Sequence, residues 1–178
     1  MSTLFVNNLN TASGSTITVP TGKQIIGTDT NSIKAPGMII QVVQFTNATQ
    51  VSTASTSAVV TNLAGTITPK YSTSHIYVMI NQRVFANPGA GGSAGDWGLQ
   101  RSTDGASSYS QIYVRGRTGL TDNTGGCDVQ ASIMFKDTPG ITTVVHYRTT
   151  IRNNAGAGNM YANLDSNLAM MTLMEIAQ

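Results

Sequence analysis

The side chains that could do acid–base, nucleophilic or metal chemistry are few in this sequence, and they lie far apart. The two histidines, His75 and His146, have no second histidine or carboxylate at the spacing of a metal site. Cys127 is the one cysteine, which excludes an intramolecular disulfide and a thiolate metal cluster. We therefore expect a buried, unreactive Cys127, structural or exposed histidines, no Ser-His-Asp triad, and neither a metal nor a cofactor.

The carboxylates also fail to form a recognisable catalytic pair. Most of the eight acidic residues fall in or beside predicted turns, where aspartate caps backbone amides. A glycosidase needs two carboxylates about 5–10 Å apart, and the sequence leaves open that two loop aspartates meet. The Asp96-Trp97 pair is compatible with stacking on a sugar. Trp97 as a core residue at a strand edge is the favoured interpretation, because large aromatic side chains mainly fill cores.

The glycine-rich stretch 89–95 superficially resembles a phosphate-binding loop. It is followed by Asp96-Trp97 and not by a lysine, a serine or threonine and a helix, so the phosphate-binding geometry is missing. We predict a flexible loop at this stretch. With no catalytic pattern elsewhere, we predict that the protein is not an enzyme.

Composition points to a β protein with many turns. Of the 178 residues, 10% are charged and 40% hydrophobic, against about 25% and 45–50% in an average globular chain. The net charge is +2, and Arg115 and Arg117 are the only close basic pair, so we expect no nucleic-acid partner. The N-terminus lacks the features of a signal peptide and no apolar run approaches 18 residues. We expect no membrane partner and synthesis in the cytoplasm without secretion.

Residues 37–178 are expected to form an antiparallel β-sandwich head, because short alternating strands are separated by clusters of turn residues. The strand at 75–85, for example, places Ile76, Val78, Ile80 and Val84 on one face. The last strand is apolar on both faces, which predicts that one face packs in the core and the other against a partner chain. The predicted strands are 38–45, 57–68, 75–85, 97–101, 109–115, 127–136, 141–151 and 168–177.

Residues 1–36 are expected to form an extended N-terminal β segment that trimerises and anchors the protein. The segment has one apolar stripe and almost no bulk, so about 35 residues cannot bury that stripe on themselves. Three chains around one axis would cover it; a flexible tail is the alternative. The residues assigned to this stripe are Leu4, Val6, Ile17, Val19, Ile25 and Ile33.

The four long connections, 46–56, 86–96, 116–126 and 152–167, should lie at one end of the sandwich if each strand crosses it once. A scaffold that gathers its loops in this way presents a binding surface. Side chains with several hydrogen-bonding directions, plus one aromatic face, suit hydroxyl-rich glycans. The candidate receptor-binding residues are Arg117, Asp122, Asn123, Asn153, Asn154 and Tyr161; solvation of the loops is their alternative role.

Much of the chain resembles short, fibre-like structural proteins of cyanophages and other aquatic bacteriophages. The resemblance is carried by 3–9, 12–29 and 35–44 near the N-terminus, and by the motifs Leu63–Pro69 and Leu173–Ala177 further along. It implies a virion protein, trimeric, with an N-terminal stalk and a C-terminal jelly-roll head, and it implies no catalytic residue. The long loops have no part in it.

The leading hypothesis is a short tail fibre that docks on other virion proteins through residues 1–36 and presents a trimeric β head to the host. The first alternative is a capsid decoration protein whose N-terminal arm grips the shell. A glycan-cleaving tailspike is a more remote alternative, because the catalytic pattern is missing.

We predict that the protein is a homotrimer in solution, because neither the apolar stripe of the N-terminal segment nor the two-faced last strand can be covered by one chain. Light scattering at micromolar concentration should give three times the mass of the 18.7 kDa chain. A monodisperse, folded monomer would contradict this prediction.

Overall fold

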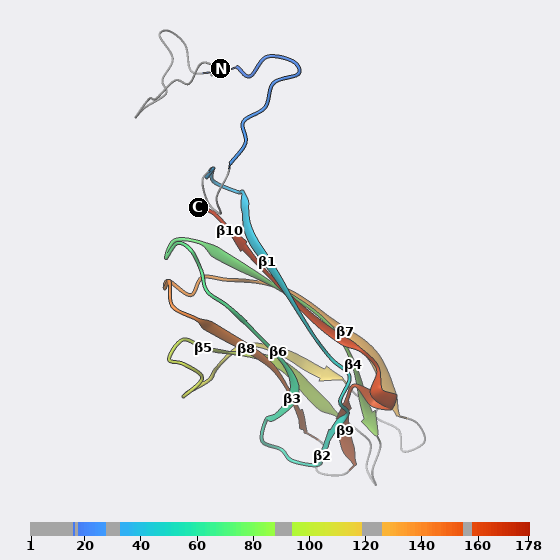
Figure 1. Cartoon of the computed structure of the whole chain (residues 1–178). Helices are drawn as coiled ribbons and strands as arrows, with labels where there is room; N and C mark the ends of the chain where they lie inside the picture. The colour runs from blue at the N-terminus through green and yellow to red at the C-terminus, as the bar shows by residue number, and fades with distance from the viewer. Residues whose placement is uncertain (1–15, 17, 28–32, 88–93, 119–125, 155–157) are drawn as a thin grey trace. The chain divides into compact units, whose positions relative to one another are not determined.

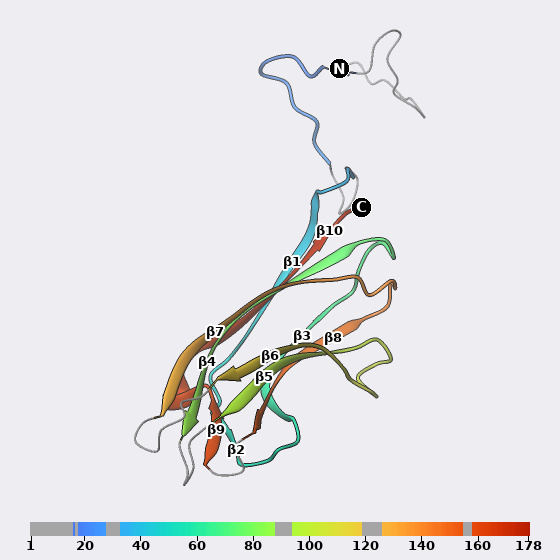
Figure 2. The same ribbon diagram turned by 180° about the vertical axis from the view of Figure 1, so that it is seen from behind.

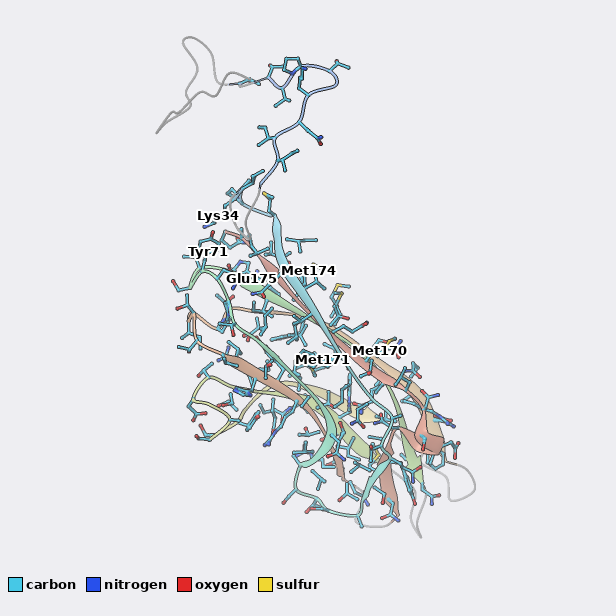
Figure 3. The ribbon with its side chains drawn as sticks, viewed as in Figure 1. Lys34, Tyr71, Met170, Met171, Met174 and Glu175 are labelled. Atoms are coloured by element: carbon cyan, nitrogen blue, oxygen red, sulfur yellow. The ribbon has the colours of Figure 1, made fainter. Side chains whose placement is uncertain are left out.

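The computed structural model describes residues 16, 18–27, 33–87, 94–118, 126–154 and 158–178. The chain divides into two units, Met1–Ile33 and Lys34–Gln178, close to the predicted boundary after residue 36. The Lys34 ammonium group lies 3.9 Å from the centre of the Tyr71 ring (Figure 3). The Gly37 N–H donates to the carbonyl of Ala177 at 2.8 Å. These contacts join residues 34–37 to the second unit, here called the head.

The described part of the head is all β apart from one 3₁₀ turn, η1 (Leu164–Ser166), as the sequence predicts (Figures 1 and 2). All eight predicted strands are present, with ends shifted by a few residues. Two short strands, β2 and β9, lie within connections that were expected to be loops. The strands are β1 (Ile39–Asn47), β2 (Val51–Thr53), β3 (Val59–Ile67), β4 (His75–Asn87), β5 (Gly95–Ser102), β6 (Ser110–Thr118), β7 (Cys127–Asp137), β8 (Val145–Asn153), β9 (Asn159–Ala162) and β10 (Ala169–Ile176).

The strands form two antiparallel sheets with jelly-roll topology. The first sheet has the order β1-β10-β4-β9-β2, with β7 also paired to β4, and is called sheet A. The second, sheet B, has the order β3-β8-β5-β6. Without the two short strands, four long strands lie in each sheet, and β5–β6 is the one consecutive pair within a sheet. This is the arrangement of a double-sheet jelly roll built from two Greek keys.

Alternation along the strands places the core between the two sheets. In β4 the predicted apolar face is confirmed, since Ile76, Val78, Ile80 and Val84 are all at most 3% exposed. Successive strand residues point to opposite faces, so the residues between them lie on the outer face of sheet A. Gly65 of β3 lets the sheets approach, because a Cβ there would lie 2.4 Å from the Phe45 ring of β1.

A network of buried polar side chains joins the two sheets across the core. The indole N–H of Trp97 in β5 donates to Gln82 Oε1 of β4 at 3.0 Å. The Gln82 amide donates in turn to Thr61 Oγ1 of β3 at 3.1 Å and to Asn163 Oδ1 at 2.9 Å. Thr61 also bonds to the hydroxyl of Thr149 in β8. Gln82, Thr61, Thr149 and Asn163 are all 0% exposed, so each bond satisfies a group that has no access to water.

A second buried group, Glu175 of β10, attaches the β3–β4 connection to sheet A. Its carboxylate accepts the backbone N–H groups of Lys70 at 2.8 Å and Tyr71 at 3.3 Å, and the Gln41 amide at 2.6 Å. Glu175 is 0% exposed, and charge-assisted bonds of this kind are stronger than neutral ones. The connection is thereby held beside the start of the head, where Tyr71 contacts Lys34.

Replacement of Gln82 by methionine should lower the free energy of unfolding by about 2–4 kcal/mol, because it leaves the Trp97 N–H and the Asn163 oxygen buried without this partner. Urea denaturation followed by Trp97 fluorescence measures the change. The matched control, Gln130→Met at an exposed position of β7, should alter stability by less than about 0.5 kcal/mol. Equal effects of the two substitutions would contradict the role of the network.

Candidate interaction surfaces

Trp97 is a core residue and does not form a sugar-stacking pair with Asp96. Its side chain is 1% exposed and its indole nitrogen is bonded to Gln82, which confirms the favoured interpretation from the sequence. Asp96 points to the outer face of sheet B, where its Oδ2 accepts a hydrogen bond from Arg152 Nε at 2.7 Å. Adjacent strand residues face opposite sides of a sheet, so the Trp97 ring packs in the core while the Asp96 carboxylate faces outward.

A shallow hollow of about 200 Å³ lies beside this ion pair on sheet B. It forms over Gly98, where a Cβ would lie 2.3 Å from Gln111 Nε2. The Gln111 amide is already bonded to the Leu99 and Tyr113 carbonyls, at 3.0 and 2.7 Å. The residues around the hollow supply one carboxylate, where a glycosidase needs two. They are Ala58, Asp96, Trp97, Gly98, Gln111, Val114, Thr150, Ile151 and Arg152.

The described acidic residues outside this hollow serve local structure. Arg83 bonds both Asp128, at 2.6 Å, and Asp165, at 3.0 Å, and its hydrogen bonds lower the pKa of Asp128. Asp104 accepts bonds from Ser102 and from Ser108 within one turn, which lowers the Asp104 pKa far below its usual value. These carboxylates therefore stabilise turns and contacts between strands.

Burial and a neighbouring carboxylate act together on Tyr147. Its hydroxyl donates to Asp137 Oδ2 at 2.7 Å, while Arg101 Nη1 bonds Asp137 Oδ1 at 2.7 Å. Burial is the larger cause and the Asp137 charge the next in raising the pKa of Tyr147, so it is a neutral donor at physiological pH. This set of bonds links the ends of β5, β7 and β8.

In the described ranges, no group of three or more histidine, cysteine, aspartate or glutamate residues could hold a metal ion. His75 lies on the outer face of sheet A, with its Nδ1 3.2 Å from Thr138 Oγ1. Cys127 is half-buried against the core. No helix in the part of the chain that the structure describes is long and apolar enough to cross a membrane.

The end of the sandwich where β1 finishes, here called the distal end, gathers described residues of three of the four connections predicted there; most of the fourth, 116–126, lies outside the described residues. Asn153 N–H donates to Ser55 O, and Asn154 N–H donates to Ala94 O, both at 2.8 Å. These bonds bring together described residues of the connections β1–β3, β4–β5 and β8–β10. Strands β2 and β9 pair in the same region and extend sheet A there (Figure 1).

The predicted receptor-binding residues do not all offer free side chains at this end. Asn153 is 2% exposed and its amide donates to Gly158 O at 2.8 Å, so its burial does not fit a surface contact. Asn154 is half-buried. Tyr161 is also half-buried, on β9, and its ring packs at a tilted 6.0 Å from Phe85. The inward position of Asn153 at the end of β8 is not visible in the sequence.

Other candidate residues fall partly outside the described residues. The backbone of Arg117 belongs to β6, whereas Asp122 and Asn123 lie outside the described ranges. Among the proposed stalk residues, Leu4, Val6 and Ile17 also lie outside them, and no strand is present in the described residues before Ile39. The others are exposed in the single chain: Val19 by 40%, Ile25 by 65% and Ile33 by 41%.

The outer face of sheet A carries a surface that the sequence analysis only partly recognised. Three rows of paired residues cross strands β1, β10, β4 and β7, and we call them the methionine face. Met134 at 75% exposed and Val42 at 52% are its most open apolar members. The rows are Val42-Met174-Tyr77-Lys136, Gln44-Thr172-Met79-Met134 and Thr46-Met170-Asn81-Ser132.

Strand β10 contributes to both sides of sheet A, as its sequence predicts. Met171 and Leu173 are 0% exposed in the core, whereas Met170 and Met174 belong to the methionine face (Figure 3). Met134 was not identified from the sequence. The sequence did offer a signal for it: Met134 lies between Ile133 and Phe135, which face the core, so alternation places this apolar residue on the outer face.

No family model matches the chain, and no curated protein matches it in sequence. Among solved structures the chain is similar to the Eiger TNF protein of S. frugiperda, with 12% identity and a TM-score of 0.37 over 81% of this chain and 95% of that one. It is also similar to a chain of infectious bursal disease virus, Gx strain, with 17% identity and a TM-score of 0.35 over 85% of this chain and 42% of that one. A mutant VP2 protein of the same virus, from T=1 particles, gives 18% identity and a TM-score of 0.38. This chain spans 40% of that VP2 chain. The fold class itself rests on the strand order.

Proposed function

We propose that this chain is a bacteriophage virion structural protein, a short tail fibre whose homotrimeric β head attaches the particle to its host. The observation that carries the proposal is the division of the chain. A jelly-roll head, Lys34–Gln178, follows a unit without a strand among its described residues, whose described apolar side chains are exposed. Such a unit requires a partner surface, because removing apolar side chains from water lowers the free energy of the protein.

The resemblance to fibre-like proteins of aquatic phages supports this role. In the proposal, the N-terminal unit docks on another virion protein and the distal end of the head faces the host. Each contact with a host glycan is weak, but three heads on a trimer and several trimers on a particle raise the effective concentration. Arg117, Asp122, Asn123, Asn154 and Tyr161 are retained as the contact residues.

Capsid decoration is the second candidate, and one observation favours it. Asn153 is buried and both Asn154 and Tyr161 are half-buried, which leaves fewer side chains for a receptor than the sequence suggests. A decoration protein needs only its N-terminal arm to bind, while its head projects from the shell. Immunogold labelling of virions distinguishes the two, since gold at the tail supports the fibre and gold over the capsid supports decoration. A glycan-cleaving spike remains the remote third candidate.

Deletion of residues 1–33 should leave a folded β head but abolish incorporation into virions. The cut keeps Lys34 on Tyr71 and the bond from Gly37 to Ala177, so the head loses none of its own contacts. Circular dichroism reports the fold, and immunoblotting of purified particles reports incorporation. Normal incorporation of the truncated protein would show that the anchor lies elsewhere.

Combined replacement of Arg117, Asp122 and Tyr161 by alanine should reduce adsorption of particles to host cells by about tenfold or more, because weak contacts are multiplied by valency. Asn153 is left intact since it is buried. The matched control carries Lys70→Ala and Thr103→Ala, both exposed in connections at the opposite end of the head. Unchanged adsorption of the triple variant, with normal particle assembly, would favour capsid decoration.

A further inference from the structure

The methionine face is unusual for an exposed side of an antiparallel sheet. Such a sheet commonly has one face on the core and the other solvated, with polar residues outward. The outer face of sheet B follows this pattern: Arg152 pairs with Asp96, and Arg148 stacks 3.5 Å from the centre of the Tyr109 ring. The methionine face instead places Val42, Met174, Met79, Met134 and Met170 among small polar residues.

We propose that the methionine face is the surface through which three copies of this chain pack around a common axis. The inference rests on the proposed homotrimer and names the surface of the head that forms it. Methionine is suited to such a role, because its flexible and polarizable side chain adapts to an irregular partner surface.

The near absence of charge on the methionine face favours another copy of this chain as the partner that covers it. Of the twelve positions in the three rows, Lys136 is the single charged residue. It lies on β7, whose one described partner strand is β4, so its charge is at the border of the face. Side chains close to a three-fold axis meet their own symmetry copies, so charged residues there would bring like charges together and disfavour self-association. Here almost no charge opposes it, and Arg83 with its two aspartates is internally paired beyond the rows.

The size of the face also fits a contact between chains. The three rows span Met170–Met174 of β10, about 17 Å along the strand, and four strands are about 19 Å wide. The plane of the face is therefore on the order of 300 Å² before side-chain relief is counted. Standard interfaces use about 800 Å² from each partner. The face therefore supplies the apolar centre of a contact rather than the whole of it.

The apolar surface continues along β1 toward the N-terminal unit. Met38 is 36% exposed and Ile39 is 55% exposed, and both precede Val42 in the chain. A heterologous contact repeated around a closed axis buries such a strip in every copy.

Site-specific photo-crosslinking of the full-length protein tests the inference. Benzoylphenylalanine is placed at Met134 or, as a second position, at Val42. The matched control is Val114, which is 53% exposed on the outer face of sheet B. After irradiation at micromolar concentration, denaturing gels should show covalent dimers and trimers from positions 134 and 42, and only monomer from position 114.

The outcomes separate this inference from the proposed function. A trimeric mass by light scattering with crosslinks from neither sheet A position overturns the methionine face as the interface, while the homotrimer stands. Equal crosslinking from position 114 overturns it as well, because the contact would not be specific to sheet A. A monomeric mass overturns both the homotrimer and the methionine face as its interface. Crosslinks that stay within one chain show that its own N-terminal segment covers the face, which also contradicts the inference.

Discussion

The fold depends on one constraint, the satisfaction of a glutamine amide buried between the two sheets. Gln82 accepts from Trp97 and donates to Thr61 and Asn163, so four elements must be in register before its amide has partners. An unpaired buried amide costs more than a mispacked methyl group, because it loses water without gaining a replacement. The network therefore favours one alignment of sheet A on sheet B over slipped alternatives, which apolar packing alone would tolerate.

With that alignment set, the two outer faces of the head acquire different characters. Sheet B presents charged side chains that are paired with one another, such as Asp96 with Arg152. Sheet A presents the methionine face, whose apolar side chains gain from contact with another surface. Strand β10 contributes to both the core and the methionine face, since its inner residues fill the core and its outer residues lie on that face. A substitution in this strand affects folding or association according to the face on which it falls.

These features give a physical basis for the proposed virion role. The apolar face of sheet A and the exposed apolar side chains of the N-terminal unit both favour association with another protein surface. One end of the head carries neither of them. The free end is the distal end, where the Asn153 and Asn154 backbone bonds hold connections from both sheets together. Glu175 does the same at the opposite end by accepting the N–H groups of Lys70 and Tyr71. Both ends of the sandwich are therefore held by hydrogen bonds between connections.

The sequence by itself determined the fold class, the eight long strands and the core position of Trp97, because alternation with period two and turn residues are local signals. It also indicated that β10 is apolar on both faces. Only the tertiary structure decided that Asn153 is buried, that β2 and β9 extend sheet A, and that Met134 joins Met174 on one surface. The physical reason is that strand pairing brings together residues far apart in the chain, and no local pattern records which strands become neighbours.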